Sequence, residues 1–156
     1  MSFLANPPTP TATEEQQLEN DGWFPAIDLA KLRATARLDG TVTPERLRYS
    51  ALTAVLGINA ELAAYKSAQQ LLGHANLAAV PAPGIDGQSA QTARYLRAVY
   101  SSVQADLIEH YRDFDTTGAG DKVAEKLALR TGELRRDVRW AVSDLLGIRR
   151  TTVELI

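Results

Sequence analysis

The chain has 156 residues and 45% hydrophobic content, which is enough for one domain with a genuine core. Its seventeen basic and nineteen acidic residues give a net charge of −2, so no global attraction to nucleic acid is expected. The absence of cysteine excludes disulfides, thiolate metal sites and cysteine catalysis, and no apolar run approaches the ~20 residues that a membrane span needs.

Residues 1–22 form a polar, proline-rich segment whose four charged residues are all acidic: Glu14, Glu15, Glu19 and Asp21. The segment has too little apolar area to order by itself, and it lacks the basic and apolar stretches of a secretory signal. We therefore expect a flexible acidic N-terminal arm on a chain that stays in a cytoplasm-like setting. Whether the arm orders on a partner stays open.

Two helices are predicted after the arm. Folded structure is expected to begin at Trp23-Phe24-Pro25, and Asp28 can cap a short helix that ends near residues 39–40. Thr43-Pro44 is a strong start for the next helix, because proline fits the first turn. The apolar stripe of that helix continues for about 28 residues to an expected end at Gly73, although a glycine in its middle, Gly57, weakens the case for continuity.

Residues 74–87 are rich in proline and glycine and have no helical period, so we expect an extended connector with a role in contacts. A third helix is predicted over about 88–115, and a fourth over about 121–146 with Gly147 as its left-handed cap. The inward positions expected for the third helix are Ala93, Leu96, Val99 or Tyr100, Val103, Leu107 and Tyr111. No candidate sheet is visible, so the predicted fold is all-α: a small bundle of about four helices with one long helix.

The fourth helix has three distinct faces. Apolar residues at steps of three, four and seven form its core stripe: Val123, Leu127, Leu134, Val138, Ala141 and Leu145. One flank is basic and the opposite flank is acidic, with Arg135, Arg136 and Arg139 against Glu133, Asp137 and Asp144. Trp140 lies off the core stripe, on the same side as Leu129.

Three interpretations of the charged flanks remain open. The first is a solvated face, in which Glu133 pairs with Arg136 for a few tenths of a kcal/mol. The second is contact with DNA phosphates, which the acidic flank and the net charge limit to a local effect. The third is head-to-tail packing of copies, basic flank on acidic flank, with Trp140 as an anchor. It predicts a subunit interface made of Glu133, Arg135, Arg136, Asp137, Arg139, Trp140 and Asp144.

The last nine residues alternate and are rich in β-branched side chains, although no strand elsewhere in the chain is available to pair with them. We therefore expect three parts. They are the flexible acidic arm of residues 1–22, a helical domain of residues 23–147 and an extended C-terminal tail of residues 148–156.

One glycine-rich motif, Asp115-Thr116-Thr117-Gly118-Ala119-Gly120-Asp121, is similar to the phosphate-binding signature of ribokinase-type sugar kinases. Those kinases need a large α/β domain, for which this chain has neither the length nor the strands. The preferred interpretation is a turn in which Asp121 caps the fourth helix. A small phosphate-binding enzyme that uses Gly118–Asp121 stays as an alternative, beside a helical DNA-binding module.

No metal, cofactor or enzymatic activity is expected. The segment that starts at Asp113 begins like a calcium loop, but its twelfth position is Ala124 instead of a bidentate glutamate. His74 and His110 are the only histidines, and neither has a second ligand at metal spacing. Nothing singles out a serine or threonine with the base and orienting group that nucleophilic catalysis needs.

Short segments from about residue 23 to 156 follow one another in a recognisable order, centred on Arg136-Asp137-Val138-Arg139-Trp140-Ala141-Val142. The others are Trp23-Phe24-Pro25 with Ile27-Asp28, Thr41-Val42 with Arg46-Leu47-Arg48, Asn59-Ala60-Glu61-Leu62 with Tyr65, Ile85-Asp86-Gly87, Arg97-Ala98-Val99, Tyr111-Arg112 and Gly120-Asp121-Lys122. In this order and spacing the chain resembles the head completion/stabilisation proteins of temperate contractile-tailed bacteriophages, a class of head-to-tail adaptors. The Thr116–Ala119 turn and the acidic arm have no clear counterpart there.

The resemblance implies a structural virion protein at the head–tail junction, made in the host bacterial cytoplasm. It implies a twelvefold ring of copies that joins the phage portal protein after DNA packaging, stabilises the filled head and offers a surface to neck and tail terminator proteins. Packaged DNA would pass through the ring without sequence-specific contacts, and no membrane is involved. In similar adaptors the C-terminal segment reaches into the portal, which gives the tail a portal-binding role by strand addition. The residues concerned are Ile148, Arg149, Arg150, Val153, Leu155 and Ile156.

Overall fold

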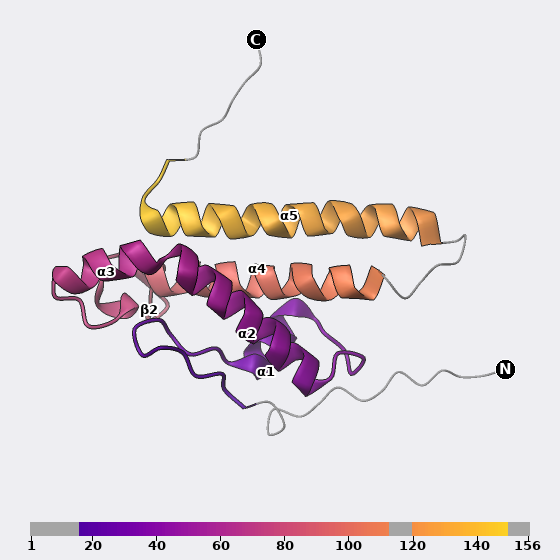
Figure 1. Ribbon diagram of the computed structural model, residues 1–156, viewed down its shortest axis with the longest axis horizontal. Helices are drawn as coiled ribbons and strands as arrows, with labels where there is room; N and C mark the ends of the chain where they lie inside the picture. Colours follow the sequence, from indigo (N-terminus) through magenta and orange to yellow (C-terminus); the bar gives the residue numbers. More distant parts are fainter. Residues whose placement is uncertain (1–15, 113–119, 150–156) are drawn as a thin grey trace, which may run out of the picture.

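The computed structural model describes residues 16–112 and 120–149, and these form a helical fold (Figure 1). Within these described residues, five α-helices follow in chain order: α1 Leu29–Ala36, α2 Pro44–Glu61, α3 Ala63–Leu71, α4 Ala90–Arg112 and α5 Gly120–Leu146. A short 3₁₀ helix and a hairpin of two-residue strands lie between α3 and α4: η1 Leu77–Ala79, β1 Gly84–Ile85 and β2 Gln88–Ser89. The all-α class predicted from the sequence is confirmed.

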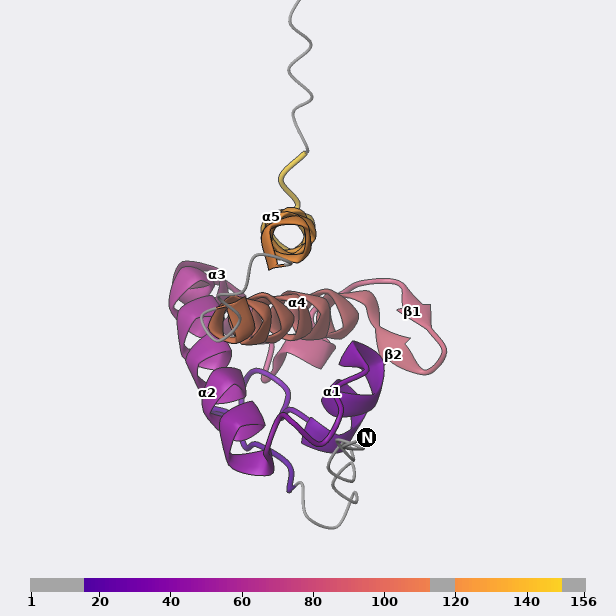
Figure 2. The ribbon, with the colours of Figure 1, turned by 90° about the vertical axis from the view of Figure 1, so that its right-hand side faces the viewer.

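α4 lies at the centre of the fold. α1 and α2 pack against one side of it, and α5 runs antiparallel along the other side as a separate outer layer (Figures 1 and 2). Because α4 has neighbours on both sides, it buries more than one stripe of residues. The predicted inward positions Val99 or Tyr100, Val103 and Leu107 are buried, but Ala93 is exposed. Tyr95, which the predicted stripe omitted, is fully buried.

The starts of α1 and α2 are set by the caps that the sequence predicted. The Asp28 carboxylate accepts a hydrogen bond from the Lys31 amide at 2.9 Å, and the Thr43 hydroxyl accepts one from the Arg46 amide at 3.3 Å. Pro44 occupies the first turn of α2, where its missing N–H leaves no bond unmade. Both predicted helix starts are confirmed.

The long helix predicted over residues 44–72 is interrupted, so the prediction of one continuous helix is wrong. Leu62 separates α2 from α3 with φ −91° and ψ 5°, while Gly57 stays helical. Leu62 is fully buried and no residue of α3 is buried, so the bend keeps this leucine in the core as α3 leaves it. Gly73 ends the element with a positive φ of 90°, as predicted.

The connector between α3 and α4 is folded, which corrects the prediction of an extended segment without a sheet. Its η1 turn buries Leu77, whose amide donates a hydrogen bond of 2.9 Å to the Trp23 carbonyl. In the hairpin, Asp86 and Gly87 have φ values of 52° and 70°, which a two-residue type I′ turn requires. Two-residue strands are too short to give an alternating pattern, so only the Asp-Gly pair signalled this hairpin.

Residues 16–22 belong to the folded unit, although the sequence analysis placed them in the flexible arm. Leu18 is buried and pairs with Ile27 through two backbone hydrogen bonds of 2.8 and 2.9 Å. The predicted boundary at residue 22 is therefore too late. The rest of the predicted arm, residues 1–15, lies outside the described part of the chain.

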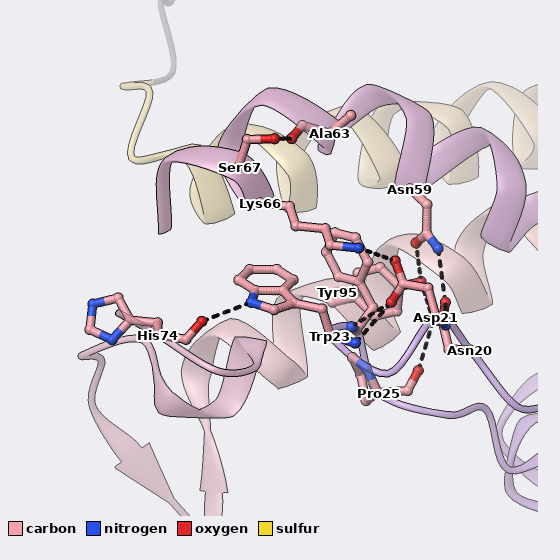
Figure 3. A network of polar contacts seen from close by, with 11 residues as sticks. Asn20, Asp21, Trp23, Pro25, Asn59, Ala63, Lys66, Ser67, His74 and Tyr95 are labelled. Atoms are coloured by element: carbon pink, nitrogen blue, oxygen red, sulfur yellow. Dashed lines mark hydrogen bonds and ion pairs between the residues drawn. The ribbon is translucent and has the colours of Figure 1, made fainter. Parts of the chain in front are cut away.

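A closed ring of side-chain hydrogen bonds joins this N-terminal segment to α2 and α4 (Figure 3). The Asn20 side-chain amide donates to the Tyr95 hydroxyl and to the Pro25 carbonyl, both at 2.9 Å. The Tyr95 hydroxyl donates to Asn59 Oδ1 at 2.6 Å, and Asn59 Nδ2 donates back to Asn20 Oδ1 at 2.8 Å. Each partly buried polar group in the ring thus has a partner, which is what makes their burial tolerable.

The pKa values of Tyr95 and Asp21, in this region, shift in opposite directions. Burial raises the pKa of the Tyr95 hydroxyl from 10.0 to about 12, because the phenolate would lose its water. Burial alone would also raise the pKa of Asp21, but hydrogen bonds from Lys66 and from the Phe24 and Trp23 amides outweigh it and hold that pKa below 3.8. The Lys66 ammonium lies 2.7 Å from Asp21 and so ties α3 to the N-terminal segment.

Candidate interaction surfaces

The apolar face of α5 holds this helix on α4. Ala141, Val142 and Leu145 are buried, and the earlier positions of the stripe are half-buried: Leu127, Leu134 and Val138. Thr131 is also buried, with its hydroxyl donating to the Leu127 carbonyl at 2.9 Å. The predicted core stripe is thus correct for its described positions, and the side chain of Val123 lies outside the described residues.

Two ion pairs flank this helix–helix contact. Arg135 Nη2 lies 2.6 Å from Glu109 Oε1, and Asp137 Oδ1 lies 3.0 Å from Arg97 Nη2. Glu109 and Arg97 belong to α4, so part of each charged flank of α5 is engaged within the chain. All four side chains are at least 34% exposed, so each pair is worth about 0–1 kcal/mol. Arg135 and Asp137 therefore help to orient α5, and their contact with another copy stays a prediction.

The side of α5 that faces away from α4 carries what we call the outer ridge: Leu129, Glu133, Arg136 and Trp140, at spacings of four, three and four residues. Leu129 is 68% exposed, and the guanidinium carbon of Arg136 lies 4.9 Å from the centroid of the Trp140 ring. Such a cation–π contact is worth ~0.5–1 kcal/mol at an exposed site. Arg139 is exposed beside the ridge, and Asp144 is half-buried. α5 is the outer layer of the fold (Figure 2), and an exposed aliphatic and a half-buried aromatic side chain lie on its outer ridge.

α5 ends in the glycine cap that the sequence predicted. Gly147 has a φ of 71°, and the Ile148 amide donates to the Ser143 carbonyl at 2.9 Å, as in a Schellman motif. Ile148 is 57% exposed, and Arg149 is exposed as well. The remaining residues of the predicted portal-binding tail lie outside the described part of the chain: Arg150, Val153, Leu155 and Ile156.

A second exposed apolar surface, which was not predicted from the sequence, lies on α2. Tyr49, Leu52 and Leu56 are 74%, 44% and 62% exposed, and their spacing puts them on one face of the helix. We call these three residues the α2 stripe. The signal was present in the sequence, because residues 49–60 contain no charged residue, which is unusual for a helix at the surface.

A groove crosses α4 between α2 and α5, with a cavity of about 300 Å³ whose lining includes Gly57, Ser102 and Val138. At its edge the Ser50 hydroxyl donates to Asp106 Oδ2 at 2.6 Å, which fastens α2 to α4. His110 Nδ1 lies 3.5 Å from Oδ1 of the same carboxylate. The Ser50 hydroxyl therefore donates to a carboxylate, and His110 Nδ1 has its shortest contact, 2.9 Å, with the Asp106 backbone carbonyl, so these contacts are not the serine–histidine pair of a catalytic triad.

The histidines and the glycine-rich motif were the other places where the sequence analysis considered chemistry. His74 lies far along the chain from His110, and its backbone carbonyl accepts a hydrogen bond of 3.1 Å from the Trp23 indole. Within residues 16–112 and 120–149, no three His, Asp or Glu side chains gather as a metal site, and no helix is long and apolar enough to cross a membrane. Most of the glycine-rich motif, residues 115–121, lies outside the described part of the chain.

The family model of the phage head completion protein (GPL) matches residues 18–156. The chain belongs to the phage head completion protein family. The chain is also similar to the head completion/stabilization protein of Escherichia phage P2, with 40% identity over 145 residues, which cover 93% of this chain and 86% of that protein. The match to the head completion family begins at Leu18, the same residue at which the described fold begins to bury its side chains.

A tyrosine recombinase XerC of Mesorhizobium japonicum is 42% identical over 82 residues, which are 50% of this chain but 23% of the recombinase. That share of the recombinase is too small to carry an activity over to a member of the head completion family. No solved structure matches the chain.

Proposed function

We propose that the chain completes a phage head: it joins the portal vertex after DNA packaging, stabilises the filled head and offers a surface to neck and tail components. One observation carries this proposal. The chain matches the head completion family over residues 18–156, and 93% of it aligns at 40% identity with a protein named for head completion and stabilisation. The role is structural, and packaged DNA passes through the assembly without sequence-specific contacts, in keeping with a net charge of −2.

Copies assemble head to tail into a closed ring, which we expect to be twelvefold. The outer ridge of α5 supports this part of the proposal, because Trp and Arg are over-represented at the centres of interfaces and Trp140 and Arg136 already stack on each other there. The proposed subunit contacts are Trp140 and Arg136 at the centre, with Arg139, Glu133 and Asp144 around them. Arg135 and Asp137 contribute by fixing α5 on α4 and extend the charged flanks of the same interface.

The tail that begins at Ile148 binds the portal protein. The Gly147 cap stops α5 abruptly and turns the chain away from the helix axis, so the tail starts from a fixed point with Ile148 exposed. An alternating β-branched peptide suits strand addition to an exposed sheet edge, where its backbone gives affinity and alternate side chains give specificity.

Assembly of particles with and without the chain tests the proposed function. Without it, DNA-filled heads should lose their DNA and fail to join tails, and the complete chain should restore both steps. Heads that stay filled and accept tails in its absence would overturn the proposal. In particles that contain the chain, a reconstruction should find it between portal and tail.

Two variants test the proposed contacts separately. Trp140→Ala should lower the number of copies per head while helicity stays unchanged, whereas Lys126→Ala, an exposed change elsewhere on α5, should have no effect. Deleting residues 148–156 should abolish attachment to portals and leave folding intact. Unchanged occupancy in the first case removes Trp140 from the interface, and normal attachment in the second removes the tail from the portal contact.

A further inference from the structure

Two exposed surfaces of this chain are almost free of charge, although 23% of its residues are charged. The first is the α2 stripe, within the uncharged residues 49–60. The second is the connector before α4: residues 75–89 contain one charged residue, Asp86, where about three would be expected at that content. We call the exposed part of this connector the hairpin face: Ala78, Ala79, Pro81, Pro83 and Ile85. Depletion of charge is the compositional mark of the buried centre of an interface.

The two surfaces lie on opposite sides of the molecule. Viewed along the long axis, α2 lies to the left of α4 and the β1–β2 hairpin to its right (Figure 2). Both are fastened to α4: α2 packs along it, and the Ala90 amide at its start donates a hydrogen bond of 2.9 Å to the Pro83 carbonyl. α4 therefore fixes the position of the α2 stripe relative to the hairpin face. A lateral contact that repeats from copy to copy requires such a fixed arrangement.

The shapes and charges of the two surfaces complement each other. Ile85 is 73% exposed beside the hairpin turn and projects as a single apolar side chain. The α2 stripe is flanked by Gly57, where an added Cβ would meet no atom within 4 Å, so that side of the helix is open to a projecting group. Asp86 follows Ile85, and Arg48 precedes Tyr49; both are exposed and of opposite sign.

We infer that copies of this chain pack side by side, with the α2 stripe of one copy on the hairpin face of the next. Contact between two different surfaces is heterologous, so it repeats from copy to copy and closes into a ring when the rotation permits. A two-fold contact of α2 with α2 would stop at a dimer and leave the hairpin face uncovered. The inference rests on the proposed self-assembly at the head, and it adds a lateral contact to the outer ridge of α5.

Cysteine cross-linking tests this contact directly, because the chain has no cysteine of its own. Leu52→Cys and Ile85→Cys variants of the full chain are mixed at high concentration and treated with a flexible thiol–thiol cross-linker. The mixture should give a covalent dimer that neither variant gives alone, and the double variant should give a ladder of higher oligomers. Leu71→Cys mixed with Ile85→Cys is the matched control, because Leu71 is 89% exposed on α3 outside both surfaces.

Several outcomes would overturn the inference. They are the absence of the mixed dimer, a Leu52→Cys dimer formed without the partner variant, and a control mixture that cross-links equally well. Adding Leu56→Asp to the Leu52→Cys variant should reduce the mixed product by at least about tenfold, since a carboxylate would be buried without a partner. Scoring the same variants for head occupancy keeps the two proposals apart. If the variants are present on heads but give no cross-link between residues 52 and 85, the lateral contact is wrong and the proposed head completion is unaffected. If the chain is absent from heads, the proposed head completion itself is wrong.

Discussion

Replacing Tyr95 by phenylalanine removes one hydroxyl and keeps the ring, which stacks on Phe24 with centroids 4.8 Å apart. The lost hydroxyl donates to Asn59 at 2.6 Å and accepts from Asn20 at 2.9 Å. A buried polar group left without a partner costs about 1–3 kcal/mol. Asn20 keeps its hydrogen bonds to Pro25 and Asn59. The groups that lose a partner are therefore the Asn59 side-chain carbonyl and one N–H of the Asn20 amide. We expect the free energy of unfolding to fall by about 2 kcal/mol.

Urea unfolding followed by circular dichroism measures this loss. The midpoint should fall while the m-value stays the same, because the variant exposes the same surface on unfolding. Tyr49→Phe is the control: it removes a hydroxyl from a tyrosine that is 74% exposed, and its effect should stay within about 0.5 kcal/mol. If Tyr95→Phe is as stable as Tyr49→Phe, the reasoning from the hydrogen-bonded ring is refuted.

Three further predictions concern pH, glycine positions and a surface ion pair. Because the Tyr95 pKa is raised from 10.0 to about 12, the stabilisation by the Tyr95 hydroxyl is fully present below pH 10 and is lost as the pH rises toward 12. In denaturant titrations, the stabilities of Tyr95→Phe and wild type should therefore converge over that pH range. A constant difference between the two would contradict this prediction. Gly147→Ala should lower the free energy of unfolding by about 1 kcal/mol, because Gly147 has a φ of 71°. Gly132→Ala, inside α5 and with no atom within 4 Å of the added Cβ, should raise it by up to about 1 kcal/mol. Thermal unfolding measures both changes, and changes of the same sign would mean that the Gly147 cap is unimportant. A double-mutant cycle with Arg135→Ala and Glu109→Ala should give a coupling below about 1 kcal/mol, and a larger value would mean that solvent screens this pair less than its exposure implies.

The sequence predicted best where a few neighbouring residues determine the structure. Asp28, Thr43-Pro44 and Gly147 begin or end helices through bonds and dihedral angles within one turn, so their chemistry can be read locally. The core stripe of α5 was also predictable, since α4 covers it from one side and leaves a simple period.

The features that the sequence did not reveal depend on distant partners. The bend at Leu62 has no glycine or proline to mark it, because it follows from where the core ends and not from backbone preference. Tyr95 is buried because Asn20 and Asn59, 75 and 36 residues away, satisfy its hydroxyl. The apolar residues of the α2 stripe and of the buried face of α2 recur with the same helical period. Only the structure therefore shows which of these apolar residues are exposed.

Any shortened version of this protein has to keep residues 16–22. A fragment truncated to start at Trp23 would lose the backbone pairing of Leu18 with Ile27. It would also lose the hydrogen bonds of Asn20 with Tyr95 and Asn59. Such a fragment would expose apolar surface and leave the Tyr95 and Asn59 side chains without one of their hydrogen-bond partners. Its aggregation would then reflect a damaged fold and would say nothing about assembly. Purification tags and fusion partners therefore belong ahead of residue 16, beyond the strand-like pairing that the N-terminal segment makes with the body.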